Sequence, residues 1–164
     1  MAHEPRLHRA LRELLSQRRT GALATRDASD PAMPWVSLVP YAIDAASGDL
    51  IIHVSALAAH TRNLECHPRT ALLVAAAETP GEPVHALARV SLDLLARTPE
   101  HGSADWASAR RAYLDRFPEA EPMTELGDFR FVRLSPLGAR QGAGFGAARS
   151  VDAEELLALR RGTD

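Results

Sequence analysis

The sequence predicts an antiparallel α+β fold or a small β-barrel, in preference to a parallel, doubly wound sheet. Apolar runs at 50–54 and 71–75 have the length of strands and are separated by one short helix. Residues 35–43 and 84–96 alternate in polarity, as strands do when one face lies on a core. Because the strands come in hairpin-connected groups and do not alternate regularly with long helices, antiparallel pairing is favoured.

The first half of the chain predicts one helix followed by three strands. Apolar residues at helical spacing between Leu7 and Leu15 indicate an amphipathic helix that ends before Gly21, and its arginines belong to a solvated face. Pro40 cannot donate a ladder hydrogen bond, so its strand is expected at an edge or at a bulge. The predicted strands are 21–26, 35–43 and 50–55, with turns at 27–31 and 44–49.

The second half predicts further strands on either side of one long helix. Alternation at 84–96 leaves one face uniformly apolar and the other mixed, as in an antiparallel sheet or a barrel wall. Helical spacing runs from Trp106 to Phe117, with Ser103 or Asp105 as the cap and Pro118 as the end. The remaining predictions are a short helix ended by Pro68, strands at 70–78 and at 128–134 with continuation past Pro136 to Gln141, a loop at 119–125 and a terminal helix at 151–159.

Length and composition are those of one globular domain that covers residues 1–164. The 164-residue chain is long enough to bury a core, and its apolar fraction of 46% and charged fraction of 24% are ordinary. A net charge of −2 provides no basic field for nucleic acid. Because the sequence has neither a signal-peptide core nor a stretch approaching the ~18 apolar residues of a membrane span, we expect a cytoplasmic protein with no membrane partner.

Several common site chemistries find no support in the sequence. Residues 142–147 satisfy the dinucleotide pattern G-x-G-x-x-[GA], but too little chain follows to build a Rossmann sheet, so a close backbone approach to a subunit or a flat ligand is the better interpretation. His60 and His67 are two helical turns apart and predict no metal site. The single cysteine, Cys66, has no catalytic partner and is expected to be a small buried hydrophobe.

The most informative stretch is 55–68, between two apolar strands. Free backbone N–H groups and the positive end of the helix dipole are expected at the start of its short helix, which suits a phosphate. Leu57 and Leu64 can meanwhile pack inward, and His60, with an ordinary pKa near 6.5, is a softer phosphate partner than lysine. The polar residues gathered there are Ser55, His60, Thr61, Arg62 and Asn63. The stretch therefore predicts an anion site, with a phosphate as the expected ligand.

A set of segments in this order and spacing carries a family resemblance. The most specific is Ser55-x-Leu57-Ala58-x-His60-Thr61-x-Asn63-Leu64, followed by His67-Pro68-Arg69. The others are 21–25, 37–42, 127–130 and 144–148. The chain resembles the pyridoxamine-5'-phosphate-oxidase-like FMN-binding split barrels, closest to their haem-utilisation branch, over nearly its whole length. The resemblance implies an antiparallel split β-barrel that forms a homodimer, with two cofactor sites at the subunit interface.

By position, the resemblance also implies which residues contact FMN. Ser55 and the turn 58–61 would contact the phosphate, with His60 where many relatives have lysine, and Asn63 would brace the turn. Residues 37–39 would run along the isoalloxazine ring and ribityl chain, while Arg140 and Gln141 would approach from the partner subunit. The implied cofactor residues are Ser37, Leu38, Val39, Ser55, Ala58, Ala59, His60, Thr61, Asn63, Arg140 and Gln141.

The expected function is FMN-dependent hydride or electron transfer to a small-molecule substrate, with no side chain predicted to be catalytic. Because 35–41 carries no charge, pyridoxamine oxidase activity itself is not expected. Haem-binding relatives often use a C-terminal histidine, whereas this chain has none after His101. The alternatives are a deazaflavin in place of FMN, binding or degradation of haem with His53, His60 or His85 as ligand, and a non-catalytic dimer whose flavin site has decayed.

Overall fold

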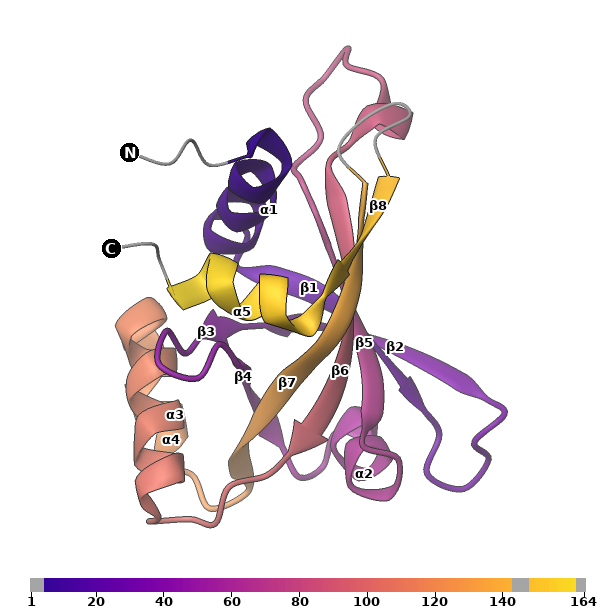
Figure 1. Ribbon diagram of the computed structural model, residues 1–164. Helices are drawn as coiled ribbons and strands as arrows, with labels where there is room; N and C mark the ends of the chain where they lie inside the picture. The colour runs from indigo at the N-terminus through magenta and orange to yellow at the C-terminus, as the bar shows by residue number, and fades with distance from the viewer. Residues whose placement is uncertain (1–4, 143–147, 162–164) are drawn as a thin grey trace.

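The computed structural model describes residues 5–142 and 148–161 and consists of one curved antiparallel sheet with helices around it (Figure 1). The strands are β1 (Thr20–Arg26), β2 (Pro34–Pro40), β3 (Ala42–Ile43), β4 (Leu50–Ser55), β5 (Arg69–Ala75), β6 (Arg89–Arg97), β7 (Phe129–Gly142) and β8 (Ala148–Asp152). The helices are α1 (Arg6–Gln17), α2 (Ala59–Cys66), α3 (Ala104–Arg116), α4 (Glu121–Thr124) and α5 (Ala153–Arg161), with 3-10 turns at η1 (Val84–Ala86) and η2 (Pro118–Ala120).

The sheet confirms the antiparallel split barrel. Its strand order is β2-β1-β5-β6-β7-β4-β3, with β8 paired to β7, and every pairing is antiparallel. The long strand β7 joins the two halves, since its first part pairs with β4 and its later part with β6. The β6–β7 register shifts between Asp93 and Leu94, which lie opposite Gly138 and Pro136. Pro136, which has no N–H to donate, thus sits at a bulge, where a strand tolerates proline.

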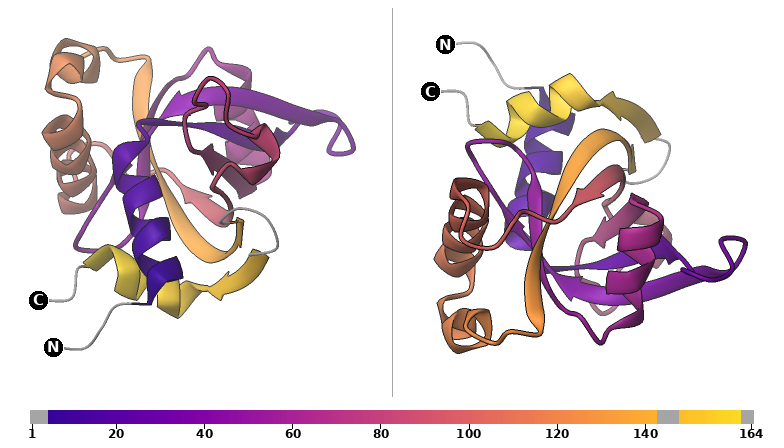
Figure 2. Two further views of the ribbon diagram at one scale, coloured as in Figure 1. Left: turned by 90° about the horizontal axis from the view of Figure 1, so that it is seen from above. Right: turned by 90° about the horizontal axis from the view of Figure 1, so that it is seen from below.

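The helices divide the buried apolar residues into two clusters. Inside the curved sheet, α1 contributes Leu11, Leu14 and Leu15, and the Tyr41 hydroxyl donates to the Leu15 carbonyl at 2.8 Å. On the outer side of β4 and β7, α3 packs Tyr113 and its neighbours over a second cluster (Figure 2). Because β4 is covered on both faces, 50–54 is continuously apolar apart from His53.

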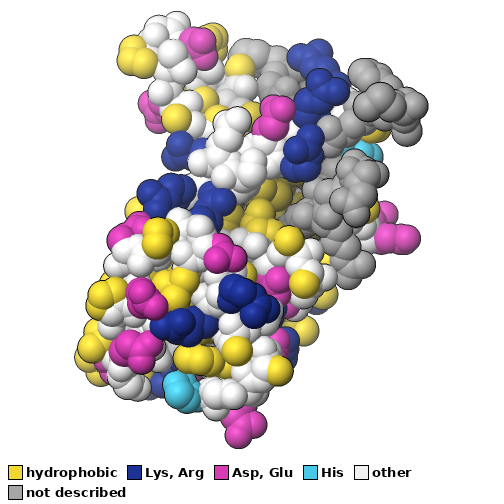
Figure 3. All heavy atoms as spheres, turned by 90° about the vertical axis from the view of Figure 1, so that its left-hand side faces the viewer, with side chains coloured by type: hydrophobic (Ala, Val, Ile, Leu, Met, Phe, Trp, Pro, Cys, Tyr) yellow, Lys and Arg dark blue, Asp and Glu magenta, His cyan; other side chains and the backbone are white. Residues whose placement is uncertain are grey.

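One face of the molecule has side chains of mixed polarity. On the side formed by α1, α3 and α5, arginine and acidic side chains are interspersed, with apolar side chains in the recess between the upper and lower parts (Figure 3). Among the described residues, none of the helices has the length and apolar character needed to cross a membrane.

Most predicted elements are confirmed, including the edge position of Pro40 and the Ser103 cap, whose Oγ accepts from the Trp106 N–H at 3.1 Å. The strand predicted at 84–96 begins only at Arg89, because its partner β5 ends at Ala75, and η1 precedes it. The loop predicted at 119–125 contains η2 and α4, and β8 was not predicted. Alternating polarity in the sequence predicts which face of a sheet each side chain lies on. The length of a strand, however, depends on where its partner strand ends. Residues 143–147 of the glycine-rich pattern lie outside the described residues.

Candidate cofactor site

The turn that leads into α2 is closed by Ser55 and Thr61. The Ser55 Oγ accepts the Leu57 N–H at 3.1 Å, and the Ser55 carbonyl accepts the Ala58 N–H at 3.1 Å and the Thr61 hydroxyl at 2.6 Å. Such side-chain bonds compete with regular structure and hold tight turns. The one proton of the Thr61 hydroxyl is therefore committed to the turn, and in this structure Thr61 donates nothing outward.

Asn63 holds α2 on the barrel. Its side chain is 1% exposed, with Nδ2 donating to the Thr25 Oγ1 at 3.0 Å and Oδ1 accepting the Ala28 N–H at 2.9 Å. The amide thus bridges the end of β1 and the turn after it. A buried amide with both ends satisfied fixes relative orientation, because leaving either end unpaired is costly. Asn63 braces α2 against β1, which positions the whole turn.

The start of α2 carries groups that attract an anion and, beside them, a carboxylate that repels one. Among the described residues, the backbone N–H groups of Ala59 and His60 have no hydrogen-bond partner, and they lie at the positive end of the helix dipole. The Asp128 carboxylate, however, has its Oδ2 3.4 Å from the Ser55 Oγ, and the Asp128 carbonyl accepts the Ala56 N–H at 2.6 Å. A carboxylate beside the turn disfavours a second anion there. Contact of Ser55 and Thr61 with a phosphate stays a prediction.

Two predicted residues from distant segments, Ser37 and His60, meet directly. The His60 Nδ1 lies 3.0 Å from the Ser37 Oγ, and burial lowers the pKa of His60, so the imidazole is neutral at neutral pH. The Nε2 atom of His60 has no hydrogen-bond partner in the described part of the chain and is not buried. Trp35, two residues before Ser37 on the same face of β2, is 44% exposed. The His60 imidazole therefore leaves Nε2 without a partner among the described residues, on the face of β2 that also carries Trp35.

Leu38 and Val39 lie on opposite faces of the edge strand. Val39 is buried in the core, whereas Leu38 is 74% exposed on the outer face of the sheet. The register places Leu38 opposite Ala22, and Ala22 opposite Leu73, which is also exposed. The outer face of β2, β1 and β5 is therefore apolar and uncovered in the described monomer.

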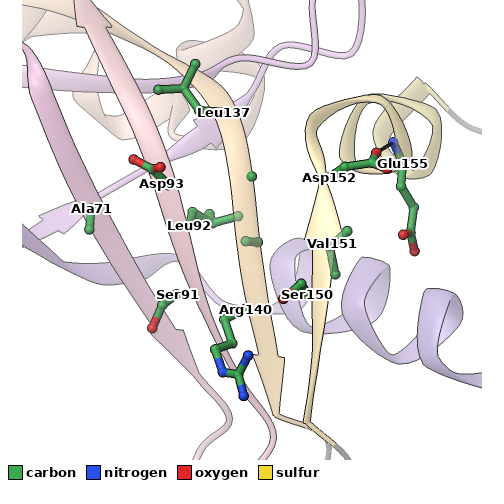
Figure 4. A pocket seen from close by; sticks show the side chains of 12 residues that line it. Ala71, Ser91, Leu92, Asp93, Leu137, Arg140, Ser150, Val151, Asp152 and Glu155 are labelled. Carbon is green, nitrogen blue, oxygen red and sulfur yellow. Dashed lines mark hydrogen bonds between the residues drawn. The ribbon is translucent and has the colours of Figure 1, made fainter.

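Arg140 projects beside a cavity of about 620 Å³ on the outer face of the other half of the sheet (Figure 4). Its guanidinium makes no hydrogen bond or ion pair with the described residues, and the hydroxyls of Ser91 and Ser150 lie on the neighbouring strands. The acidic lining residues already have partners, since Asp93 pairs with Arg69 at 2.7 Å. The lining residues are Ala71, Ser91, Leu92, Asp93, Leu137, Gly138, Ala139, Arg140, Ser150, Val151, Asp152 and Glu155.

Gln141, the neighbour of Arg140, lies in the interior of its own subunit. Its Nε2 donates to the Leu7 carbonyl at 2.9 Å, and its Oε1 accepts from the Arg149 Nε at 2.9 Å. Arg149 in turn pairs with Glu155, which also lies 2.6 Å from the His8 Nε2. Gln141 thus ties α1, β8 and α5 to β7. A contact between Gln141 and a partner's cofactor stays a prediction.

The predicted residues form two separate groups within one chain. In the strand order, β1, β5 and β6 lie between β2 and β7, which carries Arg140 and Gln141, whereas Ser55, at the end of β4, lies opposite Phe129 at the start of β7. One cross-strand row on the outer face runs through Leu38, Ala22, Leu73, Ser91 and Arg140, whereas Ser37, which meets His60, lies on the opposite face of β2. One subunit therefore carries Leu38 and Arg140 on one continuous surface.

The structure corrects two expectations near α2. Cys66, expected to be buried, is exposed on the last turn of α2, and Leu57, expected to pack inward, is 88% exposed. Leu64 does pack inward. Because α2 touches the barrel along only one narrow stripe, the residues outside that stripe stay in solvent. Trp35 and Asp128 were missed as site residues, although alternation already places Trp35 on the face of Ser37.

The chain is similar to proteins of one known family. Residues 7–141 match the pyridoxamine 5'-phosphate oxidase family. The chain is 31% identical over 153 residues to the haem oxygenase HutZ of Vibrio cholerae, covering 93% of this chain and 85% of that protein. It is 33% identical over 158 residues to a chloroplastic non-canonical haem oxygenase, HOZ, of Arabidopsis thaliana, covering 90% of this chain but 45% of the plant protein.

A solved structure supports the same assignment. The haem-binding protein from Mycobacterium smegmatis superposes with a TM-score of 0.82 at 29% identity, covering 95% of this chain and 62% of that chain. The match over residues 7–141 and the similarity to HutZ span the barrel, the α2 turn and β7 alike. The chain therefore belongs to the pyridoxamine 5'-phosphate oxidase family of split barrels.

Proposed function

We propose that the protein binds haem between two subunits and takes part in haem breakdown. The observation that carries the proposal is the cavity beside Arg140, whose guanidinium has no partner among the described residues and whose lining also includes Leu137 and Ala139. Haem combines a flat apolar ring with two carboxylates, and this cavity offers apolar lining residues and a cation that the described residues leave unpaired. The related haem oxygenases and the haem-binding protein support this choice over a flavin.

Each subunit has a distinct part in this proposal. Arg140 would bind a haem carboxylate through a charge-assisted hydrogen bond, with Ser91 and Ser150 as further polar contacts. The exposed Leu38 of the other subunit, on the outer face that forms the proposed interface, would lie against the ring. Bound haem would supply the redox chemistry of its iron, and the protein would hold, orient and partly desolvate it.

The direct test is titration with ferric haem, followed by absorbance in the Soret region. We expect saturation at one haem per subunit. Replacing Arg140 with alanine should weaken binding by roughly 10-fold or more, since a hydrogen bond to a charged group contributes about 1.5–3 kcal/mol. Arg130→Ala is the matched control, because Arg130 is paired with Glu65 away from the cavity. Lack of saturable haem binding, or equal loss in both variants, would refute the proposal.

A homodimer is part of the same proposal. The outer faces of β2, β1 and β5 expose Val36, Leu38 and Leu73 in one contiguous surface that runs on to Arg140. Monomers rarely leave such an apolar surface uncovered, and a second copy placed on it would bring parts of the site from the two subunits together.

Leu38→Glu is expected to convert the dimer to a monomer, because it buries a charge in an apolar interface. Sedimentation velocity measures the change, and circular dichroism checks that the variant remains folded. Leu126→Glu, also on an exposed leucine but beside α4, should leave the dimer intact. A wild-type monomer, or a dimer that survives Leu38→Glu, would contradict the interface.

Flavin binding is the second candidate, favoured by the unpaired N–H groups of Ala59 and His60 at the start of α2. The same titration performed with FMN discriminates the two. Saturable FMN binding without haem binding would establish the flavin alternative.

A further inference from the structure

We infer that Gly138 keeps the wall of the cavity beside Arg140 open, so that a flat ring can lie face-on against the backbone of β7. The inference rests on the proposed haem function and adds which residue selects for a planar ligand. Its basis is that the described fold does not require a glycine at this position, although the residue lines the cavity.

Glycines that the fold requires have a recognisable cause. Gly48 has a φ of 78°, a conformation that other residues rarely adopt, and a Cβ on Gly21 would lie 2.9 Å from the Leu72 Cγ. Gly138 has neither feature. Its φ is not positive, and apart from its chain neighbours a Cβ there would meet only the Val151 carbonyl oxygen among the described residues, at 3.5 Å, which is an ordinary contact.

The strand does not account for the glycine either. In the bulge of β7, Leu137 is the residue without a partner on β6, and a bulge requires glycine only where φ is positive. In a strand interior glycine is less favourable than valine or threonine, and it often marks a place where a ligand or another backbone approaches closely. A ligand or a second subunit is therefore the remaining explanation.

The register places Gly138 between two acidic residues on the outer face of the sheet, opposite Asp93 of β6 and Asp152 of β8. Both carboxylates are already engaged. Asp93 pairs with Arg69 at 2.7 Å, and the Asp152 Oδ1 accepts the Glu155 N–H at 2.8 Å at the start of α5. The backbone of β7 between the two carboxylates is therefore open to a ligand.

Arg140 lies on the same face of β7, two residues after Gly138, which is about 7 Å along a strand. A ring placed over Gly138 would reach Arg140 with one edge. The two carboxylates of haem are attached at one edge of its ring, so they would meet Arg140 and point away from Asp93 and Asp152. A side chain at 138 would hold the ring away from the sheet and forfeit its dispersion contacts. Because the described residues leave the Arg140 guanidinium unpaired, an acidic planar ligand is favoured over the backbone of a second subunit.

Titration with protoporphyrin, which is haem without its iron, tests the inference through the fluorescence of the ring. Because this probe has no metal, its affinity reports the contacts of the ring and its carboxylates alone. Gly138→Val should bind it roughly 10-fold or more weakly than the wild-type protein, and Gly138→Ala should show a smaller loss, because a larger side chain displaces the ring further. Gly127→Val is the matched control and should bind as the wild type does, since a Cβ at Gly127 would meet nothing within 4 Å and this residue does not line the cavity.

Two further measurements separate this role from a structural one. Gly138→Val should be at least as stable in urea as the wild-type protein, because valine favours a strand, and should sediment like the wild type. Wild-type affinity for protoporphyrin, a loss of stability or a changed oligomeric state in Gly138→Val would overturn the inference. The proposed function would then still stand if Arg140→Ala weakens haem binding. Absence of saturable binding of protoporphyrin and of haem by the wild-type protein would overturn both.

Discussion

Replacing Arg133 with methionine is expected to lower the free energy of unfolding by about 3–5 kcal/mol. The Arg133 side chain is 3% exposed, and its Nη1 donates to the Asp44 Oδ2 at 2.9 Å and to the Asp49 Oδ2 at 3.3 Å. Its Nη2 donates to the Asp105 carbonyl at 3.1 Å. The residue thus joins β7, the hairpin at 44–49 and α3. Its removal would leave buried carboxylates without their cation, which costs more than the pair itself contributes.

The electrostatics of Asp44 agree with this role. Burial opposes its ionisation, but hydrogen bonds from Arg133 and from the Ala46 N–H outweigh burial and lower the pKa of Asp44. Urea denaturation followed by circular dichroism measures the loss. Arg69→Met, which removes an exposed arginine paired with Asp93, should change stability by no more than about 1 kcal/mol. A loss below that value for Arg133→Met would show that the network relaxes or is hydrated.

Acidification from pH 6.5 to pH 4 is expected to cost about 3 kcal/mol of stability through His53 alone. His53 is 8% exposed within the aromatic cluster under α3, and its Nδ1 has no hydrogen-bond partner among the residues that the structure describes. Burial lowers the pKa of His53 from 6.5 to about 4. Between pH 6.5 and pH 4, the unfolded chain therefore binds a proton at His53 that the native protein does not bind. The contribution of His53 is complete above pH 6.5 and is lost as the pH falls towards 4.

The His53→Phe variant isolates this effect, because a phenyl ring can join Tyr113, Phe129 and Phe131 without titrating. Unfolding free energies measured between pH 7 and pH 4 should fall less steeply in the variant. His60, whose pKa is also lowered, titrates in both proteins and cancels in the difference. The carboxyls whose pKa is lowered, Asp27, Asp44, Asp105 and Glu119, lose their contribution at lower pH. Equal slopes in the two proteins would rule out His53 as the source.

Most of the fold could be predicted, because it depends on patterns within short windows. Helical spacing located α1 and α3, alternation located β2 and β6, and Pro40 marked the edge of the sheet. What could not be predicted depends on partners far away in the chain. The end of β5 determines where β6 begins, and the presence of β8 depends on pairing with the end of β7.

The same division applies to the candidate site. The amino-acid sequence by itself determined that polar side chains and free N–H groups gather at the start of a short helix after an apolar strand. Only the tertiary structure decided their partners: Ser37 reaches His60 across 23 positions, Asn63 is buried against β1, and Gln141 is turned inward. The physical reason is that composition and spacing specify which groups are available locally, whereas strand register and helix packing specify which groups remain free to bind a ligand.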